Sequence, residues 1–457
     1  MPKPLKAAGV KSQSFQKKKV RLIRSPPPTK IKKLPSSPPP RKKQEPDPKK
    51  KEKTKGKEQL EEEVKPASLP RTFKIIAGTY EKNLYGLEAS LEEDTTTTST
   101  TLPVHQLKLR TLFIFPAHVA CVKTVAASPT GGKWLATGSA DEIIKIWDLR
   151  RRKEVGGLMH HSGSITHLTF PSRSHLLSAS EDGTLCLFHT RDWSVLRSLK
   201  GHKGRINNIT VHPTGKVALS VGKDKILRMW DLMRGKGAAS MKLGGEGEVV
   251  RWSVSGIRFA IQTGSTIDIY SIKMVLLYTI THPSRIHDIK FFHPHPTGVE
   301  YLLVAAEDKK VTIYELPIKD EDTTRQPKIV GELLGHQNRV KAVDTITIQI
   351  PPYVEKGEPH SKSYATTISS DGYIRIYDLD QFVEGVLSNI TDERISLESV
   401  THFDTTGSRL TCLTLADGEL ITTDPKAGVK RKREREEEED EYLGFDEELV
   451  DEEEEEE

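Results

Sequence analysis

A stretch near the middle of the chain carries the residue types from which a hydrolase builds a catalytic site. His202, Ser220 and Asp224 lie in GHKGRINNITVHPTGKVALSVGKDKILRMWDL, which runs from Gly201 to Leu232 and also contains Trp230. In a catalytic triad, a histidine takes the proton of a serine hydroxyl and an aspartate orients the histidine ring. A group of this kind usually occurs once in a domain, so the first question is whether the stretch is unique.

The stretch recurs along the chain. Residues 117–149 contain the same residue types in the same order and at nearly the same spacing: His118, Thr137, Asp141 and Trp147. Weaker copies contain His161, Ser178, Asp182 and Phe188, then His282, Asp308 and Tyr314, then His336, Thr367, Asp371 and Tyr377. In every copy an aromatic residue lies six positions after the Asp, and a hydroxyl, where present, lies four positions before it. This recurrence favours a structural role over a catalytic one.

A repeat of about 40 residues that ends in an aromatic residue is the signature of WD-repeat β-propellers. The chain resembles this family from about Phe73 to Asp424. The resemblance implies that the Trp indole donates to the hydroxyl, that the hydroxyl contacts the His, and that the Asp holds the His in a tight turn. Each buried polar atom then has a partner inside its blade. We therefore interpret the two complete sets as structural tetrads: His118, Thr137, Asp141 and Trp147, and His202, Ser220, Asp224 and Trp230.

The remaining copies lack part of this set. Phe188 has no N–H group to donate, and Val304 stands where a hydroxyl would precede Asp308. We expect the blades that contain these residues to depend more on apolar packing.

The sequence predicts an all-β, seven-bladed WD-repeat propeller over residues 71–424. Six units start near His118, His161, His202, Glu246, His282 and His336. The stretch FKIIAGTYEKNLYGLEA, residues 73–89, is typical of two strands around a turn, and LKLRTLFIF of an outer strand. The stretch SRLTCLTL, residues 408–415, matches an innermost strand that lacks a turn of its own. We expect residues 72–116 and 408–416 to form one closing blade, because closure removes free sheet edges.

Two units depart from the repeat. The fifth, residues 245–272, has strand patterning but neither the His nor the turn Asp, and is inferred from its position between better-matched neighbours. The unit that starts at His336 reaches its Asp after 35 residues, whereas the unit that starts at His202 does so after 22. The excess includes PPYVEKGEPHSK, residues 351–362, which is either a tolerated surface excursion or a binding loop.

The net charge of +5 combines three regions of different charge. Residues 1–70 contain 21 Lys and Arg against 7 Asp and Glu, which gives +14. Residues 425–457 contain 6 against 17, which gives −11, and the middle contains 42 against 40, which gives +2. The predicted propeller is therefore almost neutral, and the two tails carry opposite charge.

Composition also limits the class of protein. Cys121, Cys186 and Cys412 lie in apolar, strand-like runs without any CxxC pair, which favours a reducing compartment. No apolar run is long enough to span a bilayer, and the first 20 residues lack the apolar region of a signal peptide. No nucleophile, metal cluster or phosphate-binding loop is visible. We expect a soluble intracellular protein that is not an enzyme and that needs no cofactor, metal, membrane or small-molecule substrate.

Basic clusters lie near both ends of the chain. The stretches QKKKVRLIR, residues 16–24, and KRKRER, residues 430–435, are of the kind that importins read and that phosphate backbones attract. We therefore expect residence in the nucleus and nucleolus. The residues predicted to act in nuclear targeting or RNA contact are Lys17, Lys18, Lys19, Arg21, Lys430, Arg431, Lys432 and Arg433.

The two tails suggest different partners. The head, residues 1–70, is rich in Lys and Pro and low in aromatics, so we expect it to be disordered and to bind rRNA without base specificity. The acidic run at residues 436–457 contains a short apolar island, Tyr442, Leu443 and Phe445. This run is either a docking segment for basic ribosomal or ribosome-assembly proteins or a solubilising tail.

The residue three positions after each repeat His lies near one face of the predicted propeller. With their equivalents in the other units, these positions hold Cys121, Ser164, Arg205, Val249, Arg285, Arg339 and Arg409. Lys and Arg are 69 of 457 residues, so chance predicts about one cation here. Four are present, and all are Arg, whose planar fork suits carboxylate or phosphate. We predict that Arg205, Arg285, Arg339 and Arg409 bind a partner at one mouth of the central channel. Alternatively, they are solvated or paired with acids such as Glu181 and Glu307.

Three stretches narrow the resemblance further. They are FKIIAGTYEKNLYGLEA, SGSITHLTFPSRSHLLSASEDGTLCLF and GHKGRINNITVHPTGKVALSVGKDKILRMWDLMRGKGA. They resemble the PAK-interacting protein family and its fungal maintenance-of-killer relatives, most strongly over residues 162–238. The resemblance implies a nucleolar factor that binds pre-60S particles in large ribosomal subunit assembly and rRNA processing. The alternative, implied by the family's name, is an adaptor that binds and negatively regulates a protein kinase.

Overall fold

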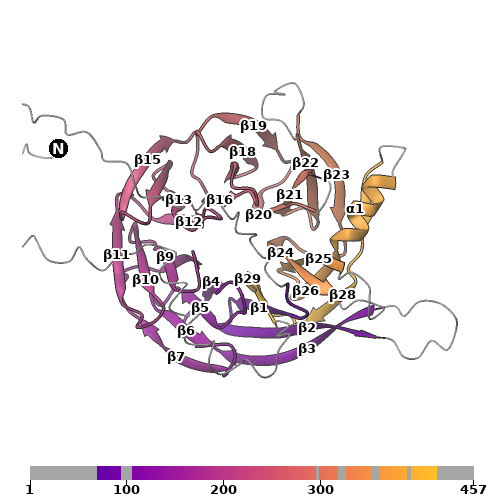
Figure 1. Ribbon diagram of the computed structural model, residues 1–457, viewed down its shortest axis with the longest axis horizontal. Coiled ribbons are helices and arrows are strands. Elements are labelled where there is room, and N and C mark those ends of the chain that lie inside the picture. The colour runs from indigo at the N-terminus through magenta and orange to yellow at the C-terminus, as the bar shows by residue number, and fades with distance from the viewer. Residues whose placement is uncertain are drawn as a thin grey trace, which may run out of the picture. The chain divides into compact units, whose positions relative to one another are not determined.

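The strands of this protein form seven sheets that are arranged around a common axis (Figure 1). We name the sheets blades A to G. The arrangement is the seven-bladed propeller that the repeats predict. The computed structural model describes residues 69–93, 105–294, 298–317, 326–350, 360–388 and 393–418.

The strands of each blade are given from the axis outward. Blade A contains β29 (Leu410–Asp417), β1 (Phe73–Thr79), β2 (Asn83–Glu93) and β3 (His105–Pro116). Blade B contains β4 (Val122–Ala127), β5 (Trp134–Ser139), β6 (Ile144–Asp148) and β7 (Lys153–Leu158). Blade C contains β8 (Ile165–Thr169), β9 (His175–Ser180), β10 (Thr184–His189) and β11 (Val195–Lys200). Blade D contains β12 (Ile206–Val211), β13 (Val217–Gly222), β14 (Ile226–Asp231) and β15 (Lys236–Lys242).

The second half of the ring contains the remaining three blades. Blade E contains β16 (Val249–Trp252), β17 (Arg258–Thr263), β18 (Thr266–Ser271) and β19 (Leu276–Thr281). Blade F contains β20 (Ile286–Phe292), β21 (Glu300–Ala306), β22 (Val311–Leu316), β23 (Lys328–Leu333) and β27 (Ile395–Leu397). Blade G contains β24 (Val340–Ile350), β25 (His360–Ser369), β26 (Tyr373–Asp378) and β28 (Thr401–Asp404).

The first strand of each blade lies nearest the axis. These strands contact one another around the ring, in the order β4, β8, β12, β16, β20, β24 and β29. Inner strands are packed on both faces by neighbouring blades, so all six residues of β9 are buried, whereas most of β11 at the rim is exposed. Burial on both faces explains why an inner strand such as β9, HLLSAS, does not alternate strictly between buried and exposed residues.

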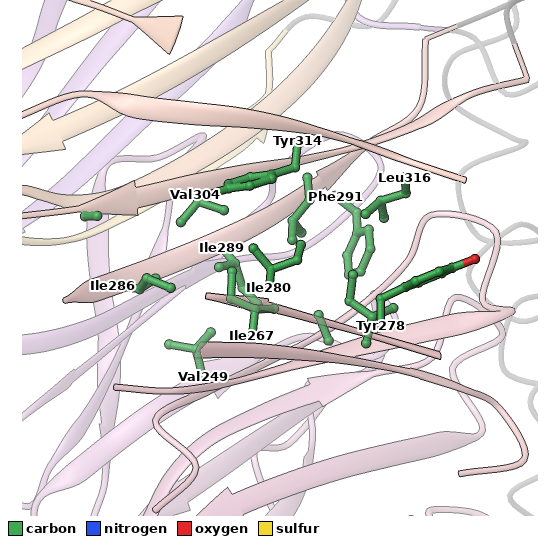
Figure 2. Close-up of a cluster of buried hydrophobic side chains, with 14 residues drawn as sticks. Val249, Ile267, Tyr278, Ile280, Ile286, Ile289, Phe291, Val304, Tyr314 and Leu316 are labelled. Carbon is green, nitrogen blue, oxygen red and sulfur yellow. The ribbon is translucent and has the colours of Figure 1, made fainter. Parts of the chain in front are cut away.

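Apolar side chains from two neighbouring blades fill each space between them. Between blades E and F, Ile267 and Ile280 of blade E meet Ile289 and Phe291 of blade F (Figure 2). The fifth unit therefore forms a complete blade without the repeat's His and Asp, because its apolar side chains pack against the next blade.

The two ends of the repeat region share blade A. β29 pairs antiparallel with β1, from Phe73 opposite Asp417 to Thr79 opposite Leu410. β1 in turn pairs with β2, and β2 with β3. The C-terminal strand thus completes the N-terminal hairpin by pairing with the inner edge of β1.

The insertion in blade G lengthens two strands. The β24–β25 ladder continues to Ile350 opposite His360, so part of the excess length is regular sheet. The rest of the predicted loop, residues 351–359, lies outside the described residues.

One helix, α1 (Leu379–Ser388), was not predicted. Asp378 caps it by accepting a hydrogen bond from the N–H of Asp380 at 3.1 Å. Phe382 is buried, and its ring centroid lies 5.4 Å from that of Tyr301 in blade F. α1 therefore covers the outer side of the ring beside blades F and G (Figure 1). Among the described residues, no helix has the length and apolarity needed to cross a membrane.

Candidate functional site

The complete tetrads form closed hydrogen-bond chains. In blade D, Trp230 Nε1 donates to Ser220 Oγ at 2.8 Å, and Ser220 Oγ lies 2.7 Å from His202 Nε2. His202 Nδ1 lies 2.9 Å from the Asp224 carboxylate. In blade B the matching distances are 2.8 to 3.0 Å, between the atoms of His118, Thr137, Asp141 and Trp147.

Burial separates these tetrads from any substrate. Ser220 is fully buried, and Trp230 already donates to its oxygen. Burial lowers the pKa of His202, although Asp224 opposes the shift. A neutral ring can donate from Nδ1 to Asp224 and accept the Ser220 hydroxyl at Nε2, which satisfies every polar atom. The arrangement stabilises the blade and leaves no free group for proton transfer.

Blade C keeps most of the same contacts. His161 lies 2.7 Å from Ser178 Oγ and 3.0 Å from the Asp182 carboxylate, although Phe188 donates nothing.

Blades F and G replace missing tetrad atoms with other polar groups. In blade F the Tyr314 hydroxyl lies 2.9 Å from His282 Nδ1. In blade G Arg375 lies 2.8 Å from His336 Nδ1 and 3.2 Å from the Asp371 carboxylate. Tyr314 and Arg375 thus supply polar contacts that the repeat pattern does not contain. That the blades of Phe188 and Val304 depend more on apolar packing stays a prediction.

Seven residues lie directly before the innermost strands or at the equivalent position, and we call them the start ring. In six blades the backbone carbonyl of this residue accepts a hydrogen bond from an N–H in the turn between the second and third strands, at 2.9 to 3.2 Å. This shared contact shows that the six positions are equivalent. The start ring consists of Cys121, Ser164, Arg205, Glu246, Arg285, Arg339 and Arg409.

The residue in blade E corrects the sequence prediction. Val250 pairs with Ile261 in blade E, as Ile209 pairs with Ser220 in blade D, so Val250 and Ile209 are equivalent positions. Arg205 lies four residues before Ile209, and the equivalent residue four before Val250 is Glu246. Val249, which the sequence predicted at this position, is buried, with only 6% of its surface exposed. The prediction was wrong because blade E has no His from which to count.

A second set of side chains lies two residues beyond the start ring. A β-bulge leaves this residue of the innermost strand out of the ladder in blades A, B, C, D, F and G. Bulges re-aim side chains. With Glu248 of blade E, they form what we call the bulge ring: Lys123, Thr166, Asn207, Glu248, His287, Lys341 and Thr411. The repeat pattern did not single them out, although each lies two positions after its start-ring residue.

Two of the four predicted arginines are paired with carboxylates of blade E. Arg205 lies 3.1 Å from Glu246, and Arg285 lies 2.9 Å from Glu248. Both arginine side chains are about half exposed, so these ion pairs are weak and solvent-screened. Arg205 and Arg285 are therefore paired with carboxylates, as the alternative interpretation expected, although with acids other than Glu181 and Glu307.

The acids expected to neutralise the arginines contact other side chains. Glu181 lies 2.9 Å from Lys123, and Glu307 lies 3.5 Å from His287. The hydrogen bond from Lys123 is the main reason why the pKa of Glu181 lies below its ordinary value.

Arg339 and Arg409 make different contacts. Arg339 Nε donates to Ser370 Oγ at 3.3 Å, and the Arg409 guanidinium lies 5.6 Å from the centre of the Tyr80 ring. The backbone N–H of Arg409, rather than its side chain, donates to Glu81. In the described ranges, neither guanidinium is within ion-pairing distance of a carboxylate.

Lys341 of the bulge ring indicates which arginines converge. Its pKa is lowered first by burial and then by repulsion from Arg339, with further repulsion from Arg285 and Arg409 and an opposing effect of Glu307. Three start-ring arginines therefore lie around Lys341, whereas Arg205 lies beside the carboxylates of other blades. We call Arg339, Lys341 and Arg409 the basic sector.

A polar network joins four blades at their innermost strands. Arg251 of blade E donates to Asn208 of blade D at 2.7 Å and to Asp288 of blade F at 3.0 Å. Asp288 also accepts the N–H of Val343 in blade G at 3.3 Å. Burial raises the pKa of Asp288, and the charge of Arg251 opposes that shift.

Several predicted features lie elsewhere. The tail cations Lys17, Lys18, Lys19, Arg21, Lys430, Arg431, Lys432 and Arg433 are outside the described residues. The three cysteines are free thiols, and burial raises the pKa of Cys186 to about 11 and that of Cys412 to about 12.

Where the structure describes the chain, no three His, Cys, Asp or Glu side chains are grouped to hold a metal ion.

The ring of blades with buried His, hydroxyl, Asp and aromatic groups defines the class: this is a WD-repeat β-propeller. The family model described as WD domain, G-beta repeat, matches residues 109–148, 152–189 and 193–231. Each match covers most or all of the outer strand of one blade and the first three strands of the next, which is blade B, C or D. These three blades keep the repeat's His, hydroxyl and Asp.

Relatives narrow the assignment. A Xenopus laevis protein named p21-activated protein kinase-interacting protein 1-like is 33% identical over 313 residues, which is 68% of this chain and 76% of the relative. Protein MAK11 of Saccharomyces cerevisiae is 31% identical over 383 residues, 76% of this chain and 83% of the relative. Shk1 kinase-binding protein 15 of Schizosaccharomyces pombe is 27% identical over 314 residues, which is 67% of this chain and 78% of the relative. The chain belongs to the family of PAK-interacting protein 1 and MAK11.

Proposed function

We propose that this chain is a non-catalytic nucleolar factor that binds precursors of the large ribosomal subunit during their assembly. Family membership carries the proposal, because the maintenance-of-killer resemblance implies this role and similarity to MAK11 extends over 76% of the chain. The geometry supports a binding role, since the tetrad hydroxyls are buried while charged side chains gather at the start ring.

In this proposal the basic sector is the main contact of the propeller. Arg339 and Arg409 are exposed, and no carboxylate of the described residues pairs with them, so their planar forks can bind carboxylate or phosphate directly. Arg205 would first have to leave Glu246. The basic head supplies non-specific contacts to rRNA, and the acidic tail meets basic ribosomal or assembly proteins.

A kinase-binding adaptor is the second candidate. The names of the relatives favour it, because one is called a p21-activated protein kinase-interacting protein and another a Shk1 kinase-binding protein. An adaptor of this kind could use the same propeller face and would not need the basic head.

Gradient sedimentation of nuclear extract tests the two candidates against each other. The tagged full chain should travel with particles that contain precursor large-subunit rRNA, and raised salt should release it. Recovery only in light fractions together with a protein kinase would contradict the assembly role and support the adaptor.

Deletion of residues 1–70 tests the RNA contact separately. The shortened chain should bind RNA more weakly and with a flatter dependence on salt, because fewer Lys–phosphate contacts release fewer counterions. An unchanged slope in a filter-binding titration would contradict the role of the head, and a melting temperature equal to that of the full chain would show that the propeller is intact.

A further inference from the structure

Blade E exposes an apolar surface that neither the fold nor the proposed function uses. Its members are between 48% and 57% exposed: Val254, Ile257, Ile272, Val275 and Leu276. All five belong to two turns or their edges, between β16 and β17 and between β18 and β19. We call this set the blade E patch.

Backbone contacts hold the two turns side by side. The N–H of Ile272 donates to the carbonyl of Ile257 at 2.9 Å, and Arg258 pairs with Ser271 in the β17–β18 ladder. Leu276 pairs with Tyr270 at the start of β19. The five side chains therefore form one surface at one end of the blade, of the kind that marks an interaction site.

The equivalent turns of blade D are polar and basic. They read HPTGKV, residues 212–217, and DLMRGK, residues 231–236. His212 connects the two blades, because its Nε2 lies 3.1 Å from the carbonyl of Gly256 and its ring packs against Trp252 at 4.8 Å. The first of these turns, which carries the exposed Lys216, therefore adjoins the apolar turn of blade E that contains Gly256.

Charge makes the patch suitable for an acidic ligand. Neither turn of blade E, SVSGIR or SIKMVL, contains Asp or Glu, and Lys273 lies exposed inside the second turn. Lys216 and Lys236 are exposed on the turns of blade D, whose only carboxylate, Asp231, accepts the N–H groups of its own turn. The ligand should combine a few large apolar side chains with flanking carboxylates.

We propose that the blade E patch binds residues 440–450 of this same chain, DEYLGFDEELV. This segment places Tyr442, Leu443 and Phe445 between acidic residues, which is the complement of an apolar patch with a basic rim. The pairing is independent of the role in ribosome assembly.

The end of β29 lies on the correct face for this contact. Asp417 accepts the N–H of Gly131 at 3.0 Å, and Gly131 lies in the turn between the first two strands of blade B. The turn that carries Val254 and Ile257 is the same turn of blade E, so both lie on one face of the ring. Residues 419–441 can span up to about 75 Å at about 3.3 Å per residue. A blade of four strands spaced about 4.8 Å apart is about 15 Å deep, so two blades on opposite sides of the ring together measure about 30 Å. The linker is therefore long enough to bring residues 440–450 to the blade E patch.

Binding of a synthetic peptide to the propeller tests the contact. The protein used should end after Arg435, beyond every described strand, and the labelled peptide should carry residues 436–457. We expect saturable binding that weakens at least about tenfold in the double variant Ile257→Ser, Val275→Ser, because two exposed apolar contacts are lost. Replacing Tyr442, Leu443 and Phe445 of the peptide by Ala should weaken binding similarly without changing its charge.

A matched variant separates the patch from general stickiness. Val119→Ser, Met159→Ser removes two apolar side chains that are 79% and 78% exposed outside blade E, and it should bind the peptide normally. Both double variants should keep the melting temperature of the parent, since all four side chains are exposed.

Competition within one molecule is the decisive measurement. The full chain should bind the added peptide at least about tenfold more weakly than the shortened chain, because a tethered segment acts at about millimolar effective concentration. Equal binding by the two chains would overturn the proposal. So would normal binding of the Ala peptide, which would mean attraction by charge alone, or normal binding by a folded Ile257→Ser, Val275→Ser variant.

Discussion

Blades D and E satisfy their buried polar groups in different ways. In blade D, His202 contacts a hydroxyl and an Asp of its own blade. Blade E has no such His, and its Arg251 instead reaches Asp288 in the next blade. A propeller can therefore replace polar contacts within a blade by polar contacts between blades, and we expect the second arrangement to couple neighbouring blades.

Breaking the contact between blades should have the largest effect. Arg251→Ala leaves Asp288 buried without its cation, which should lower the free energy of unfolding by about 3 to 5 kcal/mol. Urea unfolding measures the loss. Arg234→Ala, which removes an exposed arginine of blade D, is the control and should change stability by less than about 0.5 kcal/mol. A loss below about 1 kcal/mol for Arg251→Ala would mean that the network does not couple the blades.

Breaking a contact within a blade should cost less and act locally. Asp224→Ala leaves His202 without its carboxylate, at a cost of roughly 1 to 3 kcal/mol. Hydrogen exchange should speed up mainly in blade D, whereas Arg251→Ala should affect blades D, E, F and G together. If purified Asp224→Ala kept its melting temperature yet lost particle binding, the structural interpretation of the tetrad would be wrong.

Acid should destabilise the ring through its neutral histidines. Burial, reinforced by nearby Arg251, lowers the pKa of His167 to about 3. Because the unfolded chain binds this proton near pH 6.5, the stabilisation is complete above pH 6.5 and is lost as pH falls toward the folded pKa. Between pH 7 and pH 5 this histidine alone should account for about 2 kcal/mol. His167→Gln should reduce the slope of stability against pH, and substitution of the exposed His160 should not. An unchanged slope in His167→Gln would contradict the assignment.

The smallest effect on stability is expected at the start ring, where binding is the informative measurement. Arg339→Glu and Arg205→Glu carry the same charge change and should each alter stability by less than about 0.5 kcal/mol. Particle association should fall at least about tenfold in Arg339→Glu and much less in Arg205→Glu, whose guanidinium is already paired. Arg339→Lys should retain part of the affinity, because it keeps the charge and loses the planar fork. Equal association by both Glu variants and the parent would exclude the basic sector as the docking site.

The candidate site was only partly predictable. Arg285, Arg339 and Arg409 were selected by counting from repeat positions, and the structure brings them together around Lys341. Arg205 was selected by the same rule, yet it lies beside Glu246, a residue of the blade that has no His to set the count. Ion pairing depends on which blade is adjacent and on the register of its strand, and neither is a local property of the sequence.

By itself the sequence determined the blades, the tetrads and the closure of the ring. His202, Ser220, Asp224 and Trp230 all belong to one blade. Strand pairing within that blade is enough to bring them together, so their spacing in the sequence predicts their contacts. Only the tertiary structure decided the contact of Arg251 with Asp288, the pairing of Arg205 and the exposure of the blade E patch. These features depend on contacts between blades or on exposure to solvent at their edges, because residues about 40 positions apart become neighbours only when adjacent blades pack together.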